Sequence, residues 1–247
     1  MGINSLLYSL LTGCAMGLFA CILVIRHKSG NHGVLAASVI AFLGGIAGLV
    51  LKCMQYGHPE RLLNILARPT SKLSLELIFT ALCLIVMAVF IIWRAGISSP
   101  IFTAVAVFLC LGGIYFTGAQ YLMPSRLAWN TQLVPLLYLI SALAVGLYAA
   151  LALNASSGGL KLGVVISLAA IVLIVLYALF LTKLPSQHYS RSLERLISGD
   201  LRPAFFGALV LYAFSAVLAF LARAKTGMSA LLVSLVCTVS VCLAAYM

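Results

Sequence analysis

The chain has 247 residues, of which 64% are hydrophobic and 8% are charged. A soluble domain carries about 25% charged residues, so this composition excludes a water-soluble globular protein and predicts an integral membrane protein. The formal net charge is +11, but Lys and Arg stand singly or in pairs at the ends of apolar runs, as membrane topology requires, and this excludes a nucleic-acid-binding face.

Eight apolar runs of the sequence are long enough to cross a bilayer. A hydrocarbon core about 30 Å thick needs about 20 apolar residues, because each residue of a helix rises about 1.5 Å. The sequence therefore predicts an all-α, polytopic membrane bundle of eight transmembrane helices, forming a single membrane domain over residues 1–247. We expect these helices at approximately 5–25, 33–55, 73–93, 99–123, 131–153, 161–183, 203–222 and 227–246.

The first run, from Leu6 to Ile25, is expected to be a retained helix. No basic residue precedes it, and it is too long for the apolar region of a cleavable signal peptide. Eight spans place both chain termini on the same side of the membrane. The Lys and Arg residues divide six against nine between the two sides, which favours the side with nine as cytoplasmic, although two longer loops enlarge that count.

The densest polar cluster of the sequence follows the second predicted helix and reaches into the third. Glu76 is the one acid that stands inside an apolar run, and a carboxylate in a membrane span indicates a functional site by default. We therefore predict a small proton-handling site at one membrane face. Its polar candidates are Lys52, Gln55, His58, Arg61, Asn64, Arg68, Lys72, Ser74 and Glu76.

Two structural explanations of Glu76 remain open from the sequence. Lys72 and Glu76 stand at i,i+4 and would pair on one helix, although Lys before Glu is the weaker order. A carboxylate near a helix start also complements the helix dipole.

Two further connections carry polar and aromatic residues. The connection after the fourth predicted helix lies on the same side as the first cluster and is polar and aromatic, and its Trp and Tyr are either interfacial anchors or walls of the same pocket. They are Gln120, Tyr121, Arg126, Trp129, Asn130 and Gln132. Within 185–203, Leu193, Leu196 and Ile197 share one helical face, which suits a short interfacial helix, a partner-docking surface or a solvated linker.

The Cys and His patterns predict that this chain carries no redox cofactor. None of the seven Cys residues forms a C-x-x-C pair, whereas iron–sulfur and structural zinc sites need clustered thiolates. All four His residues fall in connections, whereas bis-histidine haem ligation inside a bundle needs two imidazoles within spans. We expect no haem, no iron–sulfur cluster and no metal ion.

One motif resembles the membrane-anchor subunit of bacterial dimethyl sulfoxide reductases, a family related to the polysulfide reductase type of quinol-interacting anchors. That family has the pattern His-Leu-Gly-x-Pro-x-Arg-x-x-Asn, with Ser-x-Glu opening the next helix. Gly57, Arg61 and Asn64 match the first element, and Ser74 and Glu76 match the second. The likeness covers the whole chain at low identity and includes the segment 112–146, with Tyr121, Trp129, Pro135 and Gly146.

The resemblance implies a subunit of an anaerobic respiratory complex in the bacterial inner (cytoplasmic) membrane. Anchors of this family bind quinol, such as menaquinol, from the membrane quinone pool. They hold a ferredoxin-like iron–sulfur subunit, which passes electrons to a molybdopterin catalytic subunit. The resemblance also places the termini and the quinol site on the periplasmic side, against the count of basic residues.

This sequence departs from the family at the histidine of the motif, where Gln55 stands instead. Gln can hydrogen-bond a quinol hydroxyl but cannot take its proton, so His58 and Glu76 are the candidate proton acceptors. Arg61 is expected to orient Glu76 or a quinone oxygen, or to contact the partner subunit. The expected quinol-binding residues are Gln55, Gly57, Arg61, Asn64, Ser74 and Lys52.

The sequence thus predicts a membrane anchor that oxidises quinol, with the terminal reduction on another chain. One alternative is a small-molecule or ion transporter, which would place polar groups at mid-membrane. The other is a purely structural anchor with a degenerate quinone site, a reading that the Gln55 departure supports.

Overall fold

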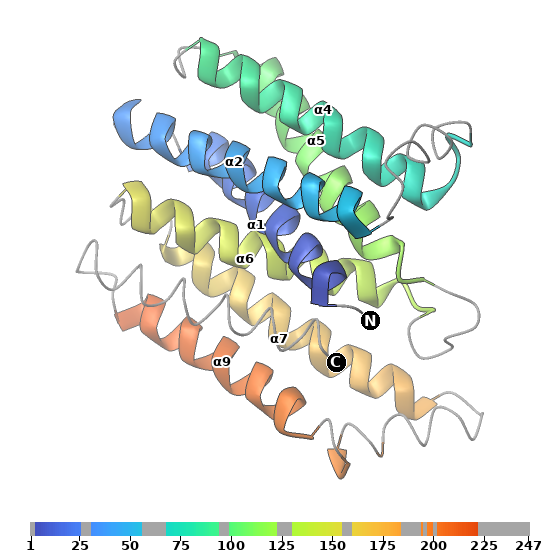
Figure 1. The fold of residues 1–247 in the computed structure, drawn as a ribbon. Helices are drawn as coiled ribbons and strands as arrows, with labels where there is room; N and C mark the ends of the chain where they lie inside the picture. Colours follow the sequence, from blue (N-terminus) through green and yellow to red (C-terminus); the bar gives the residue numbers. More distant parts are fainter. Residues whose placement is uncertain are drawn as a thin grey trace.

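The computed structural model describes residues 3–25, 31–55, 68–93, 99–122, 130–154, 160–183, 194, 197–199 and 202–221. Over these residues the fold is all-helical, with seven long helices and no strand (Figure 1). They are α1 (Ile3–Ile25), α2 (Asn31–Gln55), α4 (Lys72–Ile92), α5 (Pro100–Ala119), α6 (Leu133–Asn154), α7 (Leu160–Lys183) and α9 (Arg202–Leu221).

Six of these helices, α1 to α7, are long and apolar enough to cross a membrane. The all-α, multi-pass character predicted from the sequence is therefore present in the described part of the chain. Helix α9 coincides with the seventh predicted span, but its described apolar stretch is the shorter Phe205–Val217. The eighth predicted span, 227–246, lies outside the described residues.

The predicted helix boundaries agree with the structure to within a few residues, with the largest difference at the end of α5. The prediction extends to residue 123, whereas α5 ends at Ala119 and Gln120 caps it. The backbone N–H of Tyr121 donates to the carbonyl of Gly118 at 3.2 Å, which turns the chain out of the helix. Pro124 follows shortly afterwards in the sequence, and a helix ends readily before a proline.

The segment 185–203, for which the sequence leaves an interfacial helix, a docking surface and a solvated linker open, is described at only a few residues. The backbone N–H groups of Ser198 and Gly199 both donate to the carbonyl of Glu194, at 2.8 and 3.0 Å. These bonds close one helical turn. Leu193 and Leu196 lie outside the described residues.

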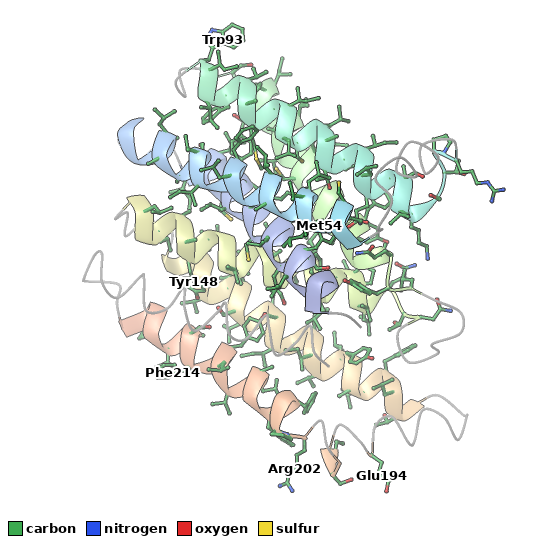
Figure 2. All side chains as sticks on the ribbon, viewed as in Figure 1. Met54, Trp93, Tyr148, Glu194, Arg202 and Phe214 are labelled. Carbon is green, nitrogen blue, oxygen red and sulfur yellow. The ribbon has the colours of Figure 1, made fainter. Side chains whose placement is uncertain are left out.

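Helix α1 lies at the centre of the bundle. It packs against α2, α5 and α6, while α4 covers α2 and α5 on one side (Figure 1). On the other side α7 packs between α6 and α9. Figure 2 shows Trp93 at the end of α4 at one end of the bundle, with Glu194 and Arg202 at the opposite end.

Two glycines allow α1 and α6 to cross in backbone contact. A Cβ atom on Gly146 would lie 2.1 Å from the carbonyl carbon of Gly17, and one on Gly17 would lie 2.2 Å from the carbonyl oxygen of Ala142. The atoms that these Cβ atoms would meet belong to the backbone, which cannot move aside as a flexible side chain can. Small residues that bring helix backbones together are the usual packing device of membrane bundles.

We predict that Gly146→Ala destabilises the protein, because the added methyl group forces the central helix away from α6. Overpacking of this kind costs about 1–3 kcal/mol. Gly44→Ala is the matched control, since its Cβ would lie 3.6 Å from the Cβ of Ala15, an ordinary contact. The measurement is the thermal unfolding midpoint in mild detergent, and equal midpoints for the two variants would contradict the crossing.

A network of hydroxyl groups attaches α9 to α6 and α7. The hydroxyl of Tyr212 donates to Ser141 Oγ at 2.7 Å, and Ser215 Oγ donates to Ser167 Oγ at 3.3 Å. The hydroxyls of Tyr148 and Ser167 also form a hydrogen bond, at 2.8 Å. All five residues are buried. Such interhelical hydrogen bonds hold helices together where the surroundings are apolar.

Candidate functional site

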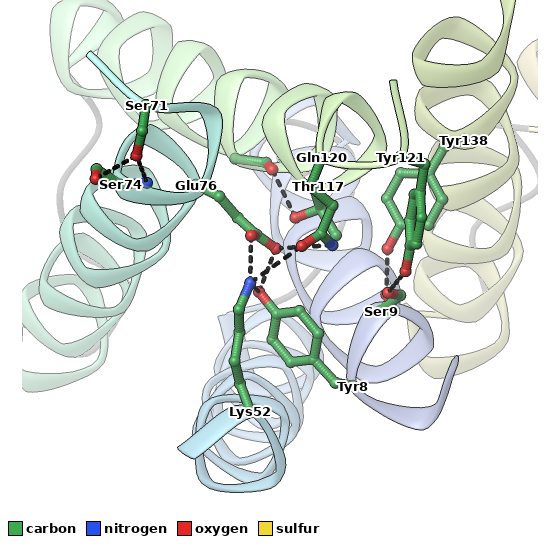
Figure 3. Close-up of polar contacts among 11 residues, drawn as sticks. Tyr8, Ser9, Lys52, Ser71, Ser74, Glu76, Thr117, Gln120, Tyr121 and Tyr138 are labelled. Carbon is green, nitrogen blue, oxygen red and sulfur yellow. Dashed lines mark hydrogen bonds and ion pairs between the residues drawn. The ribbon is translucent and has the colours of Figure 1, made fainter. Parts of the chain in front are cut away.

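Four polar side chains from four helices meet at one end of the bundle (Figure 3). They are Tyr8 of α1, Lys52 of α2, Glu76 of α4 and Gln120 at the end of α5. We refer to these four residues as the Glu76 cluster. Tyr8, Lys52 and Glu76 are 2%, 3% and 0% exposed, so the charged groups lie inside the protein.

The start of α4 fixes the position of Glu76. Ser71 is the N-cap, and its hydroxyl oxygen accepts a hydrogen bond from the backbone N–H of Ser74 at 3.1 Å. This cap satisfies one of the free N–H groups of the first turn. Glu76, Thr80 and Cys83 lie at positions i, i+4 and i+7 of α4, so all three share its buried face.

Lys52 and Glu76 form an ion pair between α2 and α4. Within the described residues it is the one contact between oppositely charged side chains. The ammonium group also donates to the hydroxyl of Tyr8 at 3.2 Å and to Gln120 Oε1 at 3.5 Å. Its nitrogen lies 4.3 Å from the centroid of the Tyr8 ring, a cation–π distance. The three N–H donors of Lys52 therefore have three acceptors.

The carboxylate of Glu76 likewise accepts hydrogen bonds from three donors. Its Oε2 accepts from Lys52, and its Oε1 accepts from the hydroxyl of Tyr8 at 2.5 Å. The amide nitrogen of Gln120 donates to the same Oε1 at 3.4 Å. A buried ion pair repays its desolvation only if both groups have such additional hydrogen bonds. The cluster is therefore a preorganised charged network.

Gln120 is the weakest and most accessible member of the Glu76 cluster. Its two contacts, at 3.4 and 3.5 Å, are the longest of the network. Its side chain is half-buried, whereas the other three members are buried. The cluster is therefore most open to a ligand at Gln120.

A second set of contacts beside the cluster joins α1, the turn that follows α5, and α6. The hydroxyls of Ser9 and Tyr121 form a hydrogen bond at 2.6 Å, and the hydroxyl of Tyr138 donates to the backbone carbonyl of Ser9 (Figure 3). Ser9 follows Tyr8 directly. These contacts hold the start of α1 against the end of α5, and so fix the position of Tyr8.

Of the residues predicted for the site, the structure brings Lys52 and Glu76 together. Ser74 lies at the start of α4, where its hydroxyl donates to the carbonyl of Arg68 at 2.8 Å and contacts that of Ser71. Its hydroxyl therefore has a role in the helix cap. Gln55 is the last residue of α2, but its side chain, and the whole of Gly57, His58, Arg61 and Asn64, lie outside the described residues.

The structure decides one of the alternatives that the sequence leaves open. Pairing between Lys72 and Glu76 is wrong as the main contact of Glu76, because the ammonium group of Lys72 donates to the carbonyl of Leu122 at 3.2 Å. Gln120, another polar residue of the connection after α5, contacts Glu76 directly. Arg126 and Trp129 of that connection lie outside the described residues.

Tyr8 is the member of the Glu76 cluster that was not predicted from the sequence. The signal available was a polar stripe on the first helix, where Tyr8 and Thr12 stand at i,i+4 within an apolar run. Tyrosine is common in membrane spans, so Tyr8 and Thr12 indicate a functional site only once the fold places them near Glu76.

No protein-family model matches the chain, and no curated protein matches it significantly. Within the described residues, no group of three His, Cys, Asp or Glu side chains lies close enough together to hold a metal ion. The assignment of a function therefore depends on the chemistry of the Glu76 cluster and on the motif resemblance.

Proposed function

We propose that this chain is the membrane anchor and quinol-oxidising subunit of a dimethyl sulfoxide reductase-like molybdoenzyme complex. The observation that carries the proposal is the buried Lys52–Glu76 pair, held by Tyr8 and Gln120 at one end of the bundle. Ionisable groups inside a membrane bundle mark substrate or proton pathways by default. The motif resemblance supplies the substrate class.

The chemistry of Gln120 suits exchange with a quinol hydroxyl. The amide of Gln120 donates to Glu76 and accepts from Lys52, through the two longest contacts of the cluster. A hydroxyl group is also both a donor and an acceptor. A quinol that enters from the bilayer would displace Gln120, donate to the Glu76 carboxylate and accept from the Lys52 ammonium group.

In this scheme the Glu76 carboxylate is a general base. Oxidation of the quinol to a quinone releases two protons and two electrons. Glu76 accepts one proton, and His58 is the candidate for the second. Lys52 stabilises the negative charge that develops on the quinol oxygen as its proton leaves. Both electrons pass to an iron–sulfur cluster of the partner subunit, since we assign no redox cofactor to this chain.

The first test is affinity purification of the chain in mild detergent, followed by mass spectrometry of proteins and bound lipids. We expect a ferredoxin-like iron–sulfur protein, a molybdopterin protein and a quinone to co-purify with it. A tagged, unrelated multi-pass membrane protein from the same membranes is the control. Recovery of the chain alone, without these proteins or a quinone, would contradict the proposal and favour a transporter.

A further inference from the structure

Two buried threonine hydroxyls lie beneath the Glu76 cluster without a hydrogen-bond partner. Among the described residues, Thr12 Oγ1 and Thr80 Oγ1 are the buried side-chain polar atoms that neither donate nor accept a hydrogen bond. The two residues are 0% and 1% exposed. Buried polar groups are nearly always satisfied, so each exception calls for an explanation.

The usual explanation for a hydroxyl on a membrane helix does not apply to these two residues. A serine or threonine commonly donates to the backbone carbonyl one turn earlier on its own helix. Thr117 does so to Gly113 and Ser38 does so to Val34, both at 2.8 Å. Thr12 and Thr80 make no such bond.

The two threonines form a second polar layer, one helical turn deeper than the Glu76 cluster. Thr12 follows Tyr8 by four residues on α1, and Thr80 follows Glu76 by four residues on the buried face of α4. Residues at i and i+4 lie on one face of a helix. On α2 the corresponding position below Lys52 is Gly48, whose missing Cβ would lie 2.4 Å from Thr12 Oγ1. The glycine leaves space for this hydroxyl beneath the ammonium group.

Apolar residues close this layer on its deeper side. Gly45 precedes Gly48 on α2 by about one turn. A Cβ on Gly45 would lie 2.8 Å from Leu84 and 3.9 Å from Ala15. Leu84 follows Thr80 by four residues. The polar column therefore has two layers, the Glu76 cluster above and the threonines below, and then ends.

We propose that water is bound between these two layers, hydrogen-bonded to Thr12 and Thr80 below and to the Glu76 cluster above. Four residues of helix separate the Cα atoms of the two layers by about 6 Å. A water molecule with a hydrogen bond of about 2.8 Å on each side spans nearly this distance. Buried water typically makes two to four hydrogen bonds to buried polar groups that otherwise have no partner, and the two threonine hydroxyls are such groups.

The bound water gives the Glu76 carboxylate a proton-exchange partner inside the bundle. It also makes the cluster a hydrated centre, in contrast to Tyr148, Tyr212 and their serine partners, whose hydroxyls bond one another directly. The proposal does not depend on the identity of the substrate, because it concerns the ligand-free protein.

The test is X-ray hydroxyl-radical footprinting of the full chain in detergent, read out by mass spectrometry. X-rays split bound water into radicals that oxidise the side chains beside it, even where bulk solvent has no access. Tyr8 reports on the proposed water. Tyr212 is the matched control, because it is also a buried tyrosine and its hydroxyl is bonded to Ser141.

We expect Tyr8 to be oxidised several-fold faster than Tyr212 in the unmodified protein. In Thr12→Val/Thr80→Val, which removes both hydroxyls and nearly preserves side-chain shape, the Tyr8 rate should fall to that of Tyr212. Thr12→Ser/Thr80→Ser should retain the fast rate. Equally slow oxidation of both tyrosines in the unmodified protein would overturn the proposal without any variant. A fast Tyr8 rate that survives the valine substitutions would also overturn it.

Discussion

Glu76→Gln should reduce quinol oxidation about 10²-fold or more while the complex remains assembled. A positioned general base contributes about 10²–10⁴-fold to a rate, and glutamine keeps the shape of the side chain but cannot accept the proton. The measurement is the oxidation rate of a reduced menaquinone analogue by the complex that co-purifies with this chain. Retention of the partner subunits establishes that assembly is intact.

Glu194→Gln is the matched control for this experiment. Glu194 is an exposed acid outside the Glu76 cluster, so the same substitution there should leave the rate unchanged. An assembled Glu76→Gln complex with an undiminished rate would remove Glu76 from the reaction. Co-purification of the partner subunits would then be the remaining support for the proposal that this chain is a membrane anchor.

Lys52→Met should destabilise the protein by about 3–5 kcal/mol, because it leaves the Glu76 carboxylate buried without its cation. The measurement is the thermal unfolding midpoint of the purified protein. Lys72→Met is the matched control, since the Lys72 side chain is exposed and donates to the carbonyl of Leu122. Its midpoint should change little.

The double variant Lys52→Met/Glu76→Gln separates stability from function. Removing both charges avoids the unpaired group, so most of the lost stability should return. Quinol oxidation should not return with it. A double variant that is both stable and fully active would show that the pair only holds α2 against α4, as expected of a purely structural anchor.

The sequence predicted the seven described helices well because each of them is an apolar run with clear ends, while the eighth predicted span lies outside the described residues. Ser71 before α4 and Pro100 at the start of α5 are helix-start signals that can be read without coordinates. Glu76 was equally visible, because a single carboxylate in an apolar run is costly wherever it lies in a bundle.

The partners of Glu76 were harder to predict, because they depend on which helices meet. Lys72 was nearer in the sequence than Lys52, but only packing between α2 and α4 brings the ammonium group of Lys52 to the carboxylate. Tyr8 comes from a helix more than sixty residues away along the chain. Hydropathy locates a span but does not say which face of it meets which neighbour.

The central position of α1 has a consequence for how this protein is made. α1 is synthesised first, yet much of its surface is covered by α5 and α6, which are synthesised much later. Until then the face of α1 that packs against α5 and α6 must face lipid, water or the insertion machinery, and Lys52 must enter the bilayer before Glu76 is synthesised. The glycine crossing of α1 with α6 is therefore a late step in biogenesis. The N-terminal half of the chain must be held in the membrane, incompletely packed, until residue 146 has been inserted.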